Sequence, residues 1–188
     1  MRVAPFGASL SLTKGVDMTP SVLVSFASRH GSTREVAETV ALTLRERGLR
    51  VELAPATEVA DVSSHDGVVL GSALYTGRVH RDARRFLKRH RAALSQPRLA
   101  VFAMGPRTLD ESDVAQSRTQ LERELARVPE IQPVSIEIFG GVVDPAKLHF
   151  PFNRMPATDA RDWDAIRNWA DEIADLYAVA QVSAAAAL

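Results

Sequence analysis

The sequence contains no cysteine. This absence excludes disulfide bonds, iron–sulfur clusters, thiol catalysis and thiolate zinc sites. No apolar run approaches the roughly 20 residues that a membrane-spanning helix needs. The 23 basic and 23 acidic side chains leave no net charge that would favour nucleic acid, a membrane or an acidic substrate. We therefore expect a cytoplasmic protein that does not bind nucleic acid and whose chemistry does not involve sulfur.

What the sequence does contain is enough apolar residues for one folded domain. With 188 residues, of which 46% are hydrophobic, the chain has the usual size of a single domain. We expect that domain at residues 20–180, after a flexible N-terminal extension (1–19) and before a frayed tail (181–188). The extension resembles a secretory leader only faintly, because no small-x-small cleavage site is evident. Translation from Met18 in place of Met1 would lose no predicted element.

Short β-rich runs alternate with longer helical patterns along this domain, which is typical of βαβ units around a parallel sheet. The five predicted strands cover residues 21–27, 49–56, 66–74, 98–105 and 132–141. The four predicted helices, whose apolar residues recur at helical spacing, cover residues 33–47, 79–94, 110–128 and 162–179. In the last helix either Leu176 or Tyr177 completes the buried face. Residues 142–160, with three prolines and little periodicity, are expected to form a long loop.

This order of elements predicts an α/β protein, a three-layer α/β/α sandwich around a five-stranded parallel sheet with right-handed crossovers. In such folds ligands bind at the carboxyl ends of the strands, where the strand order reverses. A functional site is therefore expected in the turns that follow the strands.

The turn after the first strand, residues 27–33 (ASRHGST), joins small and hydroxyl-bearing residues to the start of a helix. Free backbone N–H groups at a helix start, together with the helix dipole, bind anions and most naturally phosphate. The turn lacks the lysine and glycine spacing of a Walker loop and is not G-x-G-x-x-G, so neither a nucleoside triphosphate nor a dinucleotide is favoured. A plain helix cap remains the alternative, because Ser, Thr and Gly are common at helix starts.

The pattern Ser28-x-x-Gly31-x-Thr33 after an apolar strand resembles the phosphate-binding loop of the flavodoxin family. The resemblance runs from Ser21 to about Tyr177. It is strongest toward the branch of that family that contains menaquinone-dependent protoporphyrinogen oxidase. Three stretches carry this resemblance: SRHGSTREVA, VVLGSALYTGRVHRDARRFLKRH and TDARDWDAIRNWADEIADL. The resemblance implies the strand order 2-1-3-4-5 and FMN as the cofactor.

The resemblance also implies which residues hold the flavin. The phosphate would lie in the first turn, and the isoalloxazine ring between the turns after the third and fourth strands. The implied cofactor-binding residues are Ser28, Arg29, His30, Gly31, Ser32 and Thr33 in the first turn, Ser72, Ala73, Leu74, Tyr75, Thr76 and Gly77 in the second, and Met104, Gly105 and Pro106 in the third. Tyr75 either lies against the ring or is an ordinary surface or core aromatic residue. Because the flavin performs the redox step, no catalytic side chain is predicted.

The five histidines give no pattern typical of a metal site. His30 titrates near neutral pH, as an acid–base catalyst would, but its place in the phosphate loop favours phosphate contact or plain exposure. The other four, at positions 65, 80, 90 and 149, show no metal-ligand spacing. We predict that the protein holds no metal.

Two further stretches each have a structural and a functional interpretation. From Arg78 to Arg91 seven Arg or Lys residues stand against one acid, Asp82. They form a solvated helix face, or a docking surface for an acidic redox partner, the flavin phosphate region or an anionic membrane surface. The apolar residues of KLHFPFNRM (147–155) either cover the core or line a hydrophobic or quinone site beside the flavin.

Three functions stay open on the sequence. The first is an FMN protein that transfers electrons, as a carrier for a redox partner or as an oxidoreductase on a quinone-like small molecule. The second is a menaquinone-dependent protoporphyrinogen dehydrogenase of haem synthesis, and the third is a flavin-free binding scaffold. The intact phosphate loop disfavours the scaffold, and no residue uniquely demands a porphyrin.

Overall fold

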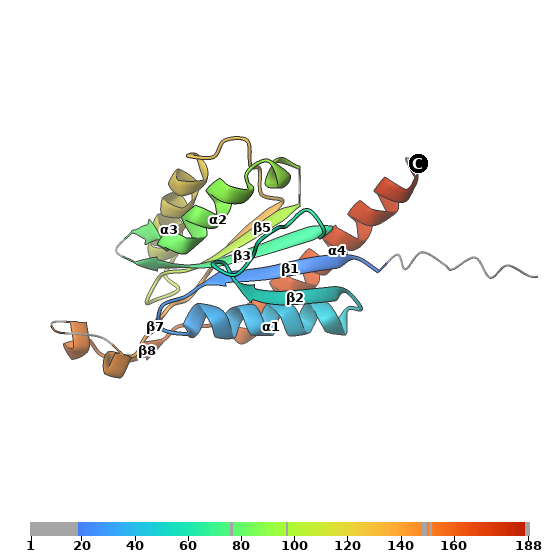
Figure 1. The fold of residues 1–188 in the computed structure, drawn as a ribbon. Coiled ribbons are helices and arrows are strands. Elements are labelled where there is room, and N and C mark those ends of the chain that lie inside the picture. The colour runs from blue at the N-terminus through green and yellow to red at the C-terminus, as the bar shows by residue number, and fades with distance from the viewer. Residues whose placement is uncertain (1–18, 76, 97, 148–149, 151, 187–188) are drawn as a thin grey trace, which may run out of the picture.

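The computed structural model describes residues 19–186 except for 76, 97, 148–149 and 151. Most of the expected N-terminal extension, including Met18, lies outside these described residues. The core of the fold is a twisted sheet with helices on both faces (Figure 1). The predicted three-layer α/β/α architecture is confirmed.

The main sheet has five parallel strands in the order β2-β1-β3-β5-β6, which is the expected order 2-1-3-4-5 once the short extra strand β4 is set aside. β4 pairs antiparallel with the end of β3. The strands are β1 (Ser21–Ala27), β2 (Arg50–Pro55), β3 (Gly67–Tyr75), β4 (Arg78–Val79), β5 (Leu99–Met104) and β6 (Ser135–Phe139). All five predicted strands are present, and the strand order reverses beside β1, between β1 and β3.

Two helices cover each face of the sheet: α1 and α4 lie on one side, and α2 and α3 on the other (Figure 1). The helices are α1 (Ser32–Glu46), α2 (Arg81–His90), α3 (Glu111–Leu125) and α4 (Trp163–Ala186), with a 3₁₀ turn η1 (Ala93–Ser95) after α2. Because both faces are covered, β1 alternates between two apolar cores, with Leu23 on the α2 and α3 side and Val24 on the α1 and α4 side.

The second helix begins later than predicted. Residues 78–79 pair with the end of β3 instead, and His80 caps the helix by accepting a hydrogen bond from the backbone N–H of Asp82 at 3.3 Å. Val79 is buried in the strand. An apolar residue would be expected there in a helix as well, so Val79 alone does not distinguish the two predictions. At the other end, Leu94 is buried from the 3₁₀ turn and not from the helix.

The last helix is longer than predicted, since its helical backbone continues to Ala186 through most of the tail that was expected to fray. Tyr177 lies on the inner face of this helix and is buried, whereas Leu176 is 45% exposed. Of the two residues that the sequence offered, Tyr177 therefore completes the buried face. Gly67 lies under the Tyr177 ring, and a Cβ at that glycine would come within 2.6 Å of the ring.

Residues 142–160 contain more structure than the predicted loop. A small antiparallel sheet pairs β7 (Val142–Val143) with β8 (Thr158–Asp159), and two 3₁₀ turns lie between them, η2 (Pro145–Lys147) and η3 (Phe152–Arg154). Gly140 permits this packing, because a Cβ there would collide with the carbonyl oxygen of Ala160. Strands of two residues are too short to show periodicity, so the sequence could not reveal them.

Candidate functional site

The turn between β1 and α1 has the conformation of an anion-binding helix start. Gly31 is the N-cap residue in the left-handed region, with φ of 97°, and no side chain caps the helix. Ser28 organises the turn, because its Oγ accepts a hydrogen bond from the N–H of Gly31 at 3.0 Å. The first intrahelical bond runs from the N–H of Glu35 to the carbonyl of Gly31. The preceding N–H groups, from residue 32 to residue 34, are therefore the ones that a helix start leaves for a ligand.

Thr33 adds a hydroxyl group that has no partner. Its side chain is fully buried, and its Oγ1 makes no hydrogen bond within the described part of the chain. Buried hydroxyl groups are nearly always hydrogen-bonded, and an unmade bond costs about 1–3 kcal/mol. The hydroxyl has no exposed surface and Thr33 does not line the cavity, so an anion bound at the helix start would accept from it only after a small shift of the turn.

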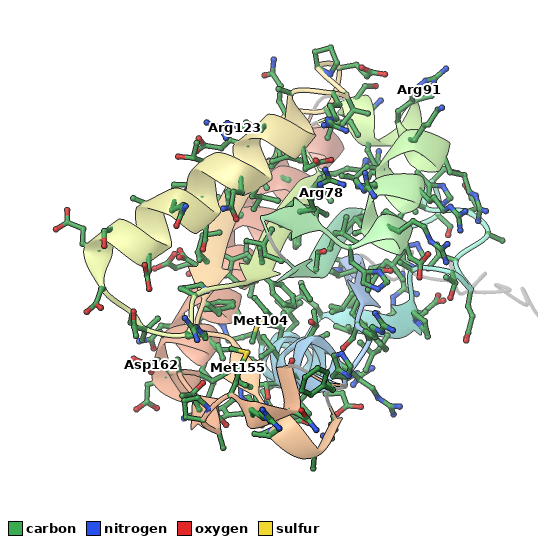
Figure 2. All side chains as sticks on the ribbon, turned by 90° about the vertical axis from the view of Figure 1, so that its left-hand side faces the viewer. Arg78, Arg91, Met104, Arg123, Met155 and Asp162 are labelled. Carbon is green, nitrogen blue, oxygen red and sulfur yellow. The ribbon has the colours of Figure 1, made fainter. Side chains whose placement is uncertain are left out.

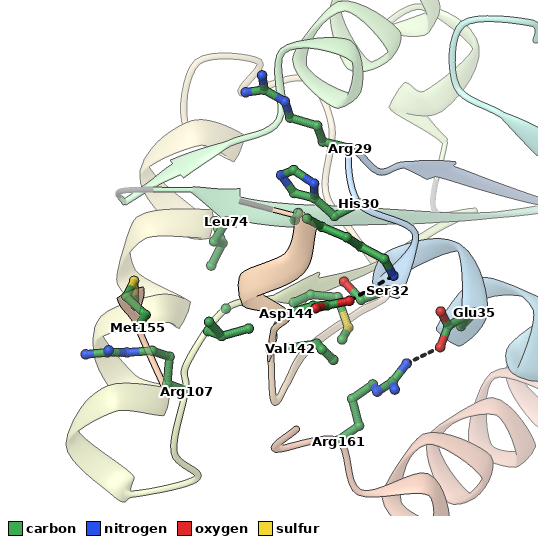
Figure 3. Close-up of a pocket in the computed structure, with 16 residues that line it drawn as sticks. Arg29, His30, Ser32, Glu35, Leu74, Arg107, Val142, Asp144, Met155 and Arg161 are labelled. Carbon is green, nitrogen blue, oxygen red and sulfur yellow. Dashed lines mark hydrogen bonds and ion pairs between the residues drawn. The ribbon is translucent and has the colours of Figure 1, made fainter. Parts of the chain in front are cut away.

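A cavity of about 910 Å³ opens at the carboxyl ends of the strands, where the fold class predicts a ligand site (Figure 3). Its volume is within the range of small-molecule and cofactor pockets. Seven of the predicted site residues line it, from three separate turns: Arg29, His30, Ser32, Ala73, Leu74, Met104 and Gly105. The structure thus brings the turns after β1, β3 and β5 together around one cavity.

The remaining predicted residues have other positions. Ser72 is buried, and its Oγ accepts a hydrogen bond from the N–H of His80 at 3.1 Å, so it holds the β3–β4 hairpin together. Gly77 and Pro106 line a smaller hollow of about 240 Å³ next to α3. The side chain of Tyr75 and all of Thr76 lie outside the described part of the chain.

Close backbone contact shapes the turn after β5. A Cβ at Gly105 would come within 2.9 Å of Leu74 Cδ1 and 3.0 Å of Ser117 Oγ. The N–H of Gly105 in turn donates to the carbonyl of Phe139 at 3.2 Å. Glycine therefore lets the β3 and β5 turns approach each other at the cavity wall.

Most of the opposite wall of the cavity was not predicted from the sequence; the exceptions are Lys147 and Met155, which belong to the KLHFPFNRM stretch that one interpretation placed beside the flavin. This wall is formed mainly by residues after β6 and by the first turn of α1: Glu35, Arg107, Gly141, Val142, Val143, Asp144, Lys147, Met155 and Arg161. Met104 and Met155, from the two walls, both lie at the end of the molecule that faces the viewer in Figure 2. Of the KLHFPFNRM stretch, Met155 is the apolar residue shown to line the cavity, whereas Phe150 is 71% exposed. Leu148 lies outside the described residues.

Arg161 is the most constrained charged group of this wall. It bonds Glu35 through Nη1 at 2.5 Å (Figure 3). It also bonds the two oxygens of Asp159, through Nε at 2.9 Å and Nη2 at 2.6 Å. Its guanidinium also lies 4.6 Å from the centroid of the Trp163 ring. The hydrogen bonds to Asp159 raise the pKa of Arg161 further above its usual range and lower the pKa of Asp159.

The other described histidines have structural contacts. His65 Nε2 lies 3.2 Å from Glu52 Oε2, His80 caps α2, and His90 is buried against the Phe86 ring. Within the part of the chain that the structure describes, no three His, Asp or Glu side chains are placed to hold a metal ion. His149 lies outside that part.

The basic stretch from Arg78 to Arg91 lies on β4 and α2, and its apolar side packs into the core through Ala83, Phe86 and Leu87. Figure 2 labels Arg78, on β4, and Arg91, just beyond the end of α2. Most of these Arg and Lys side chains are exposed, as expected of a solvated helix face. Docking of an acidic redox partner or an anionic membrane on this face stays a prediction. Among the described helices, none has the length and apolar character needed to cross a membrane.

Comparison with known proteins agrees with this geometry. A family model described as a flavodoxin domain matches residues 23–155. Protoporphyrinogen IX dehydrogenase [quinone] of Escherichia coli K12 is 23% identical, over 82% of this chain and 94% of that protein. An archaeal flavodoxin has a TM-score of 0.56 at 11% identity, covering 84% of this chain and 98% of its own. Two-electron reduced Megasphaera elsdenii flavodoxin has a TM-score of 0.54 at 15% identity, covering 82% and 98%. Because the family model spans most of the folded domain, this chain belongs to the flavodoxin domain family.

Proposed function

We propose that the protein binds FMN in the cavity and transfers electrons through it, either to a redox partner or to a small quinone-like molecule. The observation that carries this proposal is that one cavity joins the start of α1, with its backbone N–H donors and the side chain of Ser32, to the turns after β3 and β5. A site with these donors and no Walker lysine suits a single phosphate. The cavity that continues from it toward the β3 and β5 turns offers room for a ring system.

In this proposal the residues from Ser28 to Thr33 surround the phosphate. The turns after β3 and β5, with Ala73, Leu74, Met104 and Gly105 on the cavity, hold the isoalloxazine ring. Tyr75, Thr76, Gly77 and Pro106 belong to the same two turns. Backbone N–H groups of these turns would bond the ring edge and tune its potential, and the flavin, when bound, supplies the electron or hydride transfer.

The apolar residues of the opposite wall would exclude water from the ring. Val142, Val143 and Met155 contribute this surface from the connection that follows β6. A reduced flavin reacts with fewer side products where solvent is kept away, and electrostatic contacts strengthen in the same drier surroundings. The β7–β8 hairpin would therefore shape both access and selectivity.

The experiment that tests FMN binding uses two glycines that flank the same helix. Gly31 and Gly48 both have positive φ, 97° and 84°, at the start and just beyond the end of α1. Alanine at either position strains the backbone by about 1 kcal/mol. Only Gly31→Ala should weaken FMN binding, measured by quenching of flavin fluorescence on titration of flavin-free protein, whereas Gly48→Ala should bind as wild type does.

Purified protein should show the yellow absorbance of flavin, and the released chromophore should be FMN. A colourless wild-type protein that also refuses added FMN would overturn the proposal and leave a flavin-free scaffold. Equal FMN affinities for the Gly31→Ala and Gly48→Ala proteins would show that the phosphate loop does not bind the phosphate.

A second function, dehydrogenation of protoporphyrinogen with a quinone as acceptor, is favoured by the Escherichia coli relative, whose length this chain matches almost completely. Menaquinone is a lipid, so this function would bring the protein to a membrane surface from the cytoplasm, where the exposed cations of α2 would face anionic lipid headgroups. The test is anaerobic oxidation of protoporphyrinogen by the FMN-loaded protein with a menaquinone analogue. Failure under conditions in which the Escherichia coli enzyme succeeds would leave electron transfer to another acceptor.

A further inference from the structure

We infer that Arg161 adapts the helix start to a negatively charged phosphate by holding Glu35, a carboxylate that α1 itself carries into the site, in an ion pair that offsets part of its charge. This inference rests on the proposed function, because it concerns how the phosphate of FMN is accepted. Arg161 lies 126 positions from Glu35 in the sequence, and it belongs to the segment that follows β8.

Glu35 lies where an anion is expected. It is in the first turn of α1, lines the cavity, and its Oε1 would be 3.9 Å from a Cβ built on Gly31. A phosphate monoester carries between one and two negative charges at neutral pH. An unpaired carboxylate at this distance from the loop would repel it, and repulsion is strongest in a cavity with few waters.

The contacts of Arg161 show why it acts through Glu35. Two of its nitrogens form a fork with Asp159, which holds the guanidinium in place, and Nη1 is left facing Glu35 at 2.5 Å. The side chain is only 10% exposed, whereas the Glu35 side chain is 50% exposed. Arg161 is thus a mostly buried cation held by Asp159, and Glu35 is the more exposed partner of the ion pair.

No neighbouring cation in the described first turn replaces it. Arg34, next in sequence to Glu35, pairs with Glu38 at 2.8 Å. Loss of the Arg161 charge would therefore leave Glu35 facing the phosphate loop without its present ion pair. Arg161 is in this sense a positioning residue that sets the preference of the cavity for a phosphorylated flavin over an unphosphorylated one.

The test is a double-mutant cycle measured with two flavins that differ only in the phosphate. Flavin-free wild type, Arg161→Gln, Glu35→Gln and the double variant are titrated with FMN and with riboflavin. We expect Arg161→Gln to weaken FMN binding roughly three- to tenfold while riboflavin binding is unchanged. Glu35→Gln should bind FMN at least as tightly as wild type, and the double variant should return to within about twofold of wild type.

A matched control is Arg47→Gln, since Arg47 also bridges two carboxylates, Asp171 and Asp175, but at the opposite end of α1. It should leave the FMN to riboflavin affinity ratio unchanged. The loss in Arg161→Gln should also shrink between 50 and 500 mM salt, as expected for charge repulsion.

Two results would overturn the inference while leaving the proposed function intact. One is equal weakening of FMN binding in Arg161→Gln and in the double variant, which would mean that Arg161 contacts the phosphate directly or only supports the hairpin. The other is weaker FMN binding in Glu35→Gln alone, a variant that keeps the Arg161 fork and remains informative if Arg161→Gln does not fold. Absence of FMN binding in wild type would instead refute the proposed function.

Discussion

The hydroxyl of Tyr177 donates a hydrogen bond to the backbone carbonyl of Val68 at 2.8 Å, and so joins the last helix to the central strand β3. The same oxygen lies 3.1 Å from the carbonyl of Arg98, beside the start of β5. Burial raises the pKa of Tyr177, so the hydroxyl keeps its proton throughout the physiological range. One side chain of α4 therefore fastens the helix across two adjacent strands.

Replacing Tyr177 by Phe should lower the free energy of unfolding by about 1–2 kcal/mol, because the carbonyl of Val68 loses the hydroxyl donor while the ring packing over Gly67 is retained. Urea unfolding of the flavin-free protein measures this loss. Leu176→Ala is the control, since Leu176 is 45% exposed and should change stability by less than about 0.5 kcal/mol. A loss as large in Leu176→Ala would contradict the assigned orientation of the helix.

Thr33→Val should separate stability from binding. Valine has nearly the shape of threonine and removes a buried hydroxyl that has no partner, so flavin-free protein should be as stable as wild type or more stable by up to about 1 kcal/mol. FMN binding should weaken about tenfold, equivalent to about 1.4 kcal/mol, while riboflavin binding stays the same.

The control for that variant is Thr43→Val on the same helix. Thr43 donates to the carbonyl of Thr39 at 3.1 Å, so its loss should cost some stability and leave FMN affinity unchanged. Unaltered FMN affinity in Thr33→Val would mean that the buried hydroxyl does not serve the phosphate.

The central sheet and the turn between β1 and α1 could be predicted because each depends on residues that are close in sequence. The strand at residues 21–27 is apolar throughout since both of its faces are buried, and Gly48, just beyond α1, adopts the positive φ expected of a glycine at a helix end. The three turns that line the cavity follow from the rule that ligands lie at the carboxyl ends of parallel strands.

Most of the opposite wall could not be predicted, because its contacts join residues that are far apart in sequence. The Arg161–Glu35 ion pair spans 126 positions, and β7 and β8 are two residues long, so neither leaves a periodic pattern. The unmade hydrogen bond of Thr33 is likewise a property of packing. Three prolines in residues 142–160 indicated irregular structure, and a site beside the flavin was one of two interpretations of the KLHFPFNRM stretch within it.

Gly140→Ala should damage this wall. A Cβ at residue 140 would collide with the backbone carbonyl of Ala160, which cannot move without displacing β8. Overpacking of this kind costs about 1–3 kcal/mol, and we expect a lower unfolding midpoint together with weaker FMN binding. Ala146→Gly loosens an exposed position of η2 in the same connection and should change FMN affinity much less. Wild-type stability and affinity in Gly140→Ala would show that the hairpin does not need this close contact.

His90 should make the protein less stable as the pH falls below about 6.5. The imidazole is buried between α2 and the residues around Val59, and its Nε2 has no hydrogen-bond partner in the described structure. Burial lowers the pKa of His90, with a further lowering from Arg89 and an opposing effect from Asp61. Below pH 6.5 the unfolded chain therefore takes up a proton that the folded protein refuses, and stability declines until the pH reaches the lowered pKa of the folded state.

The pH range in which His90 lowers stability differs from the range in which the carboxylates do. Asp61 and Asp159 have lowered pKa values as well, but the stability that they contribute begins to be lost only as the pH falls to about 3.8, the ordinary pKa of an aspartate side chain. Urea unfolding of flavin-free protein between pH 7.5 and 5 measures the decline, and variants assign it to His90. His90→Leu should abolish most of the decline, and Arg89→Gln should reduce it, because one cause of the lowered pKa is removed. An unchanged decline in His90→Leu would place the acid sensitivity in another group.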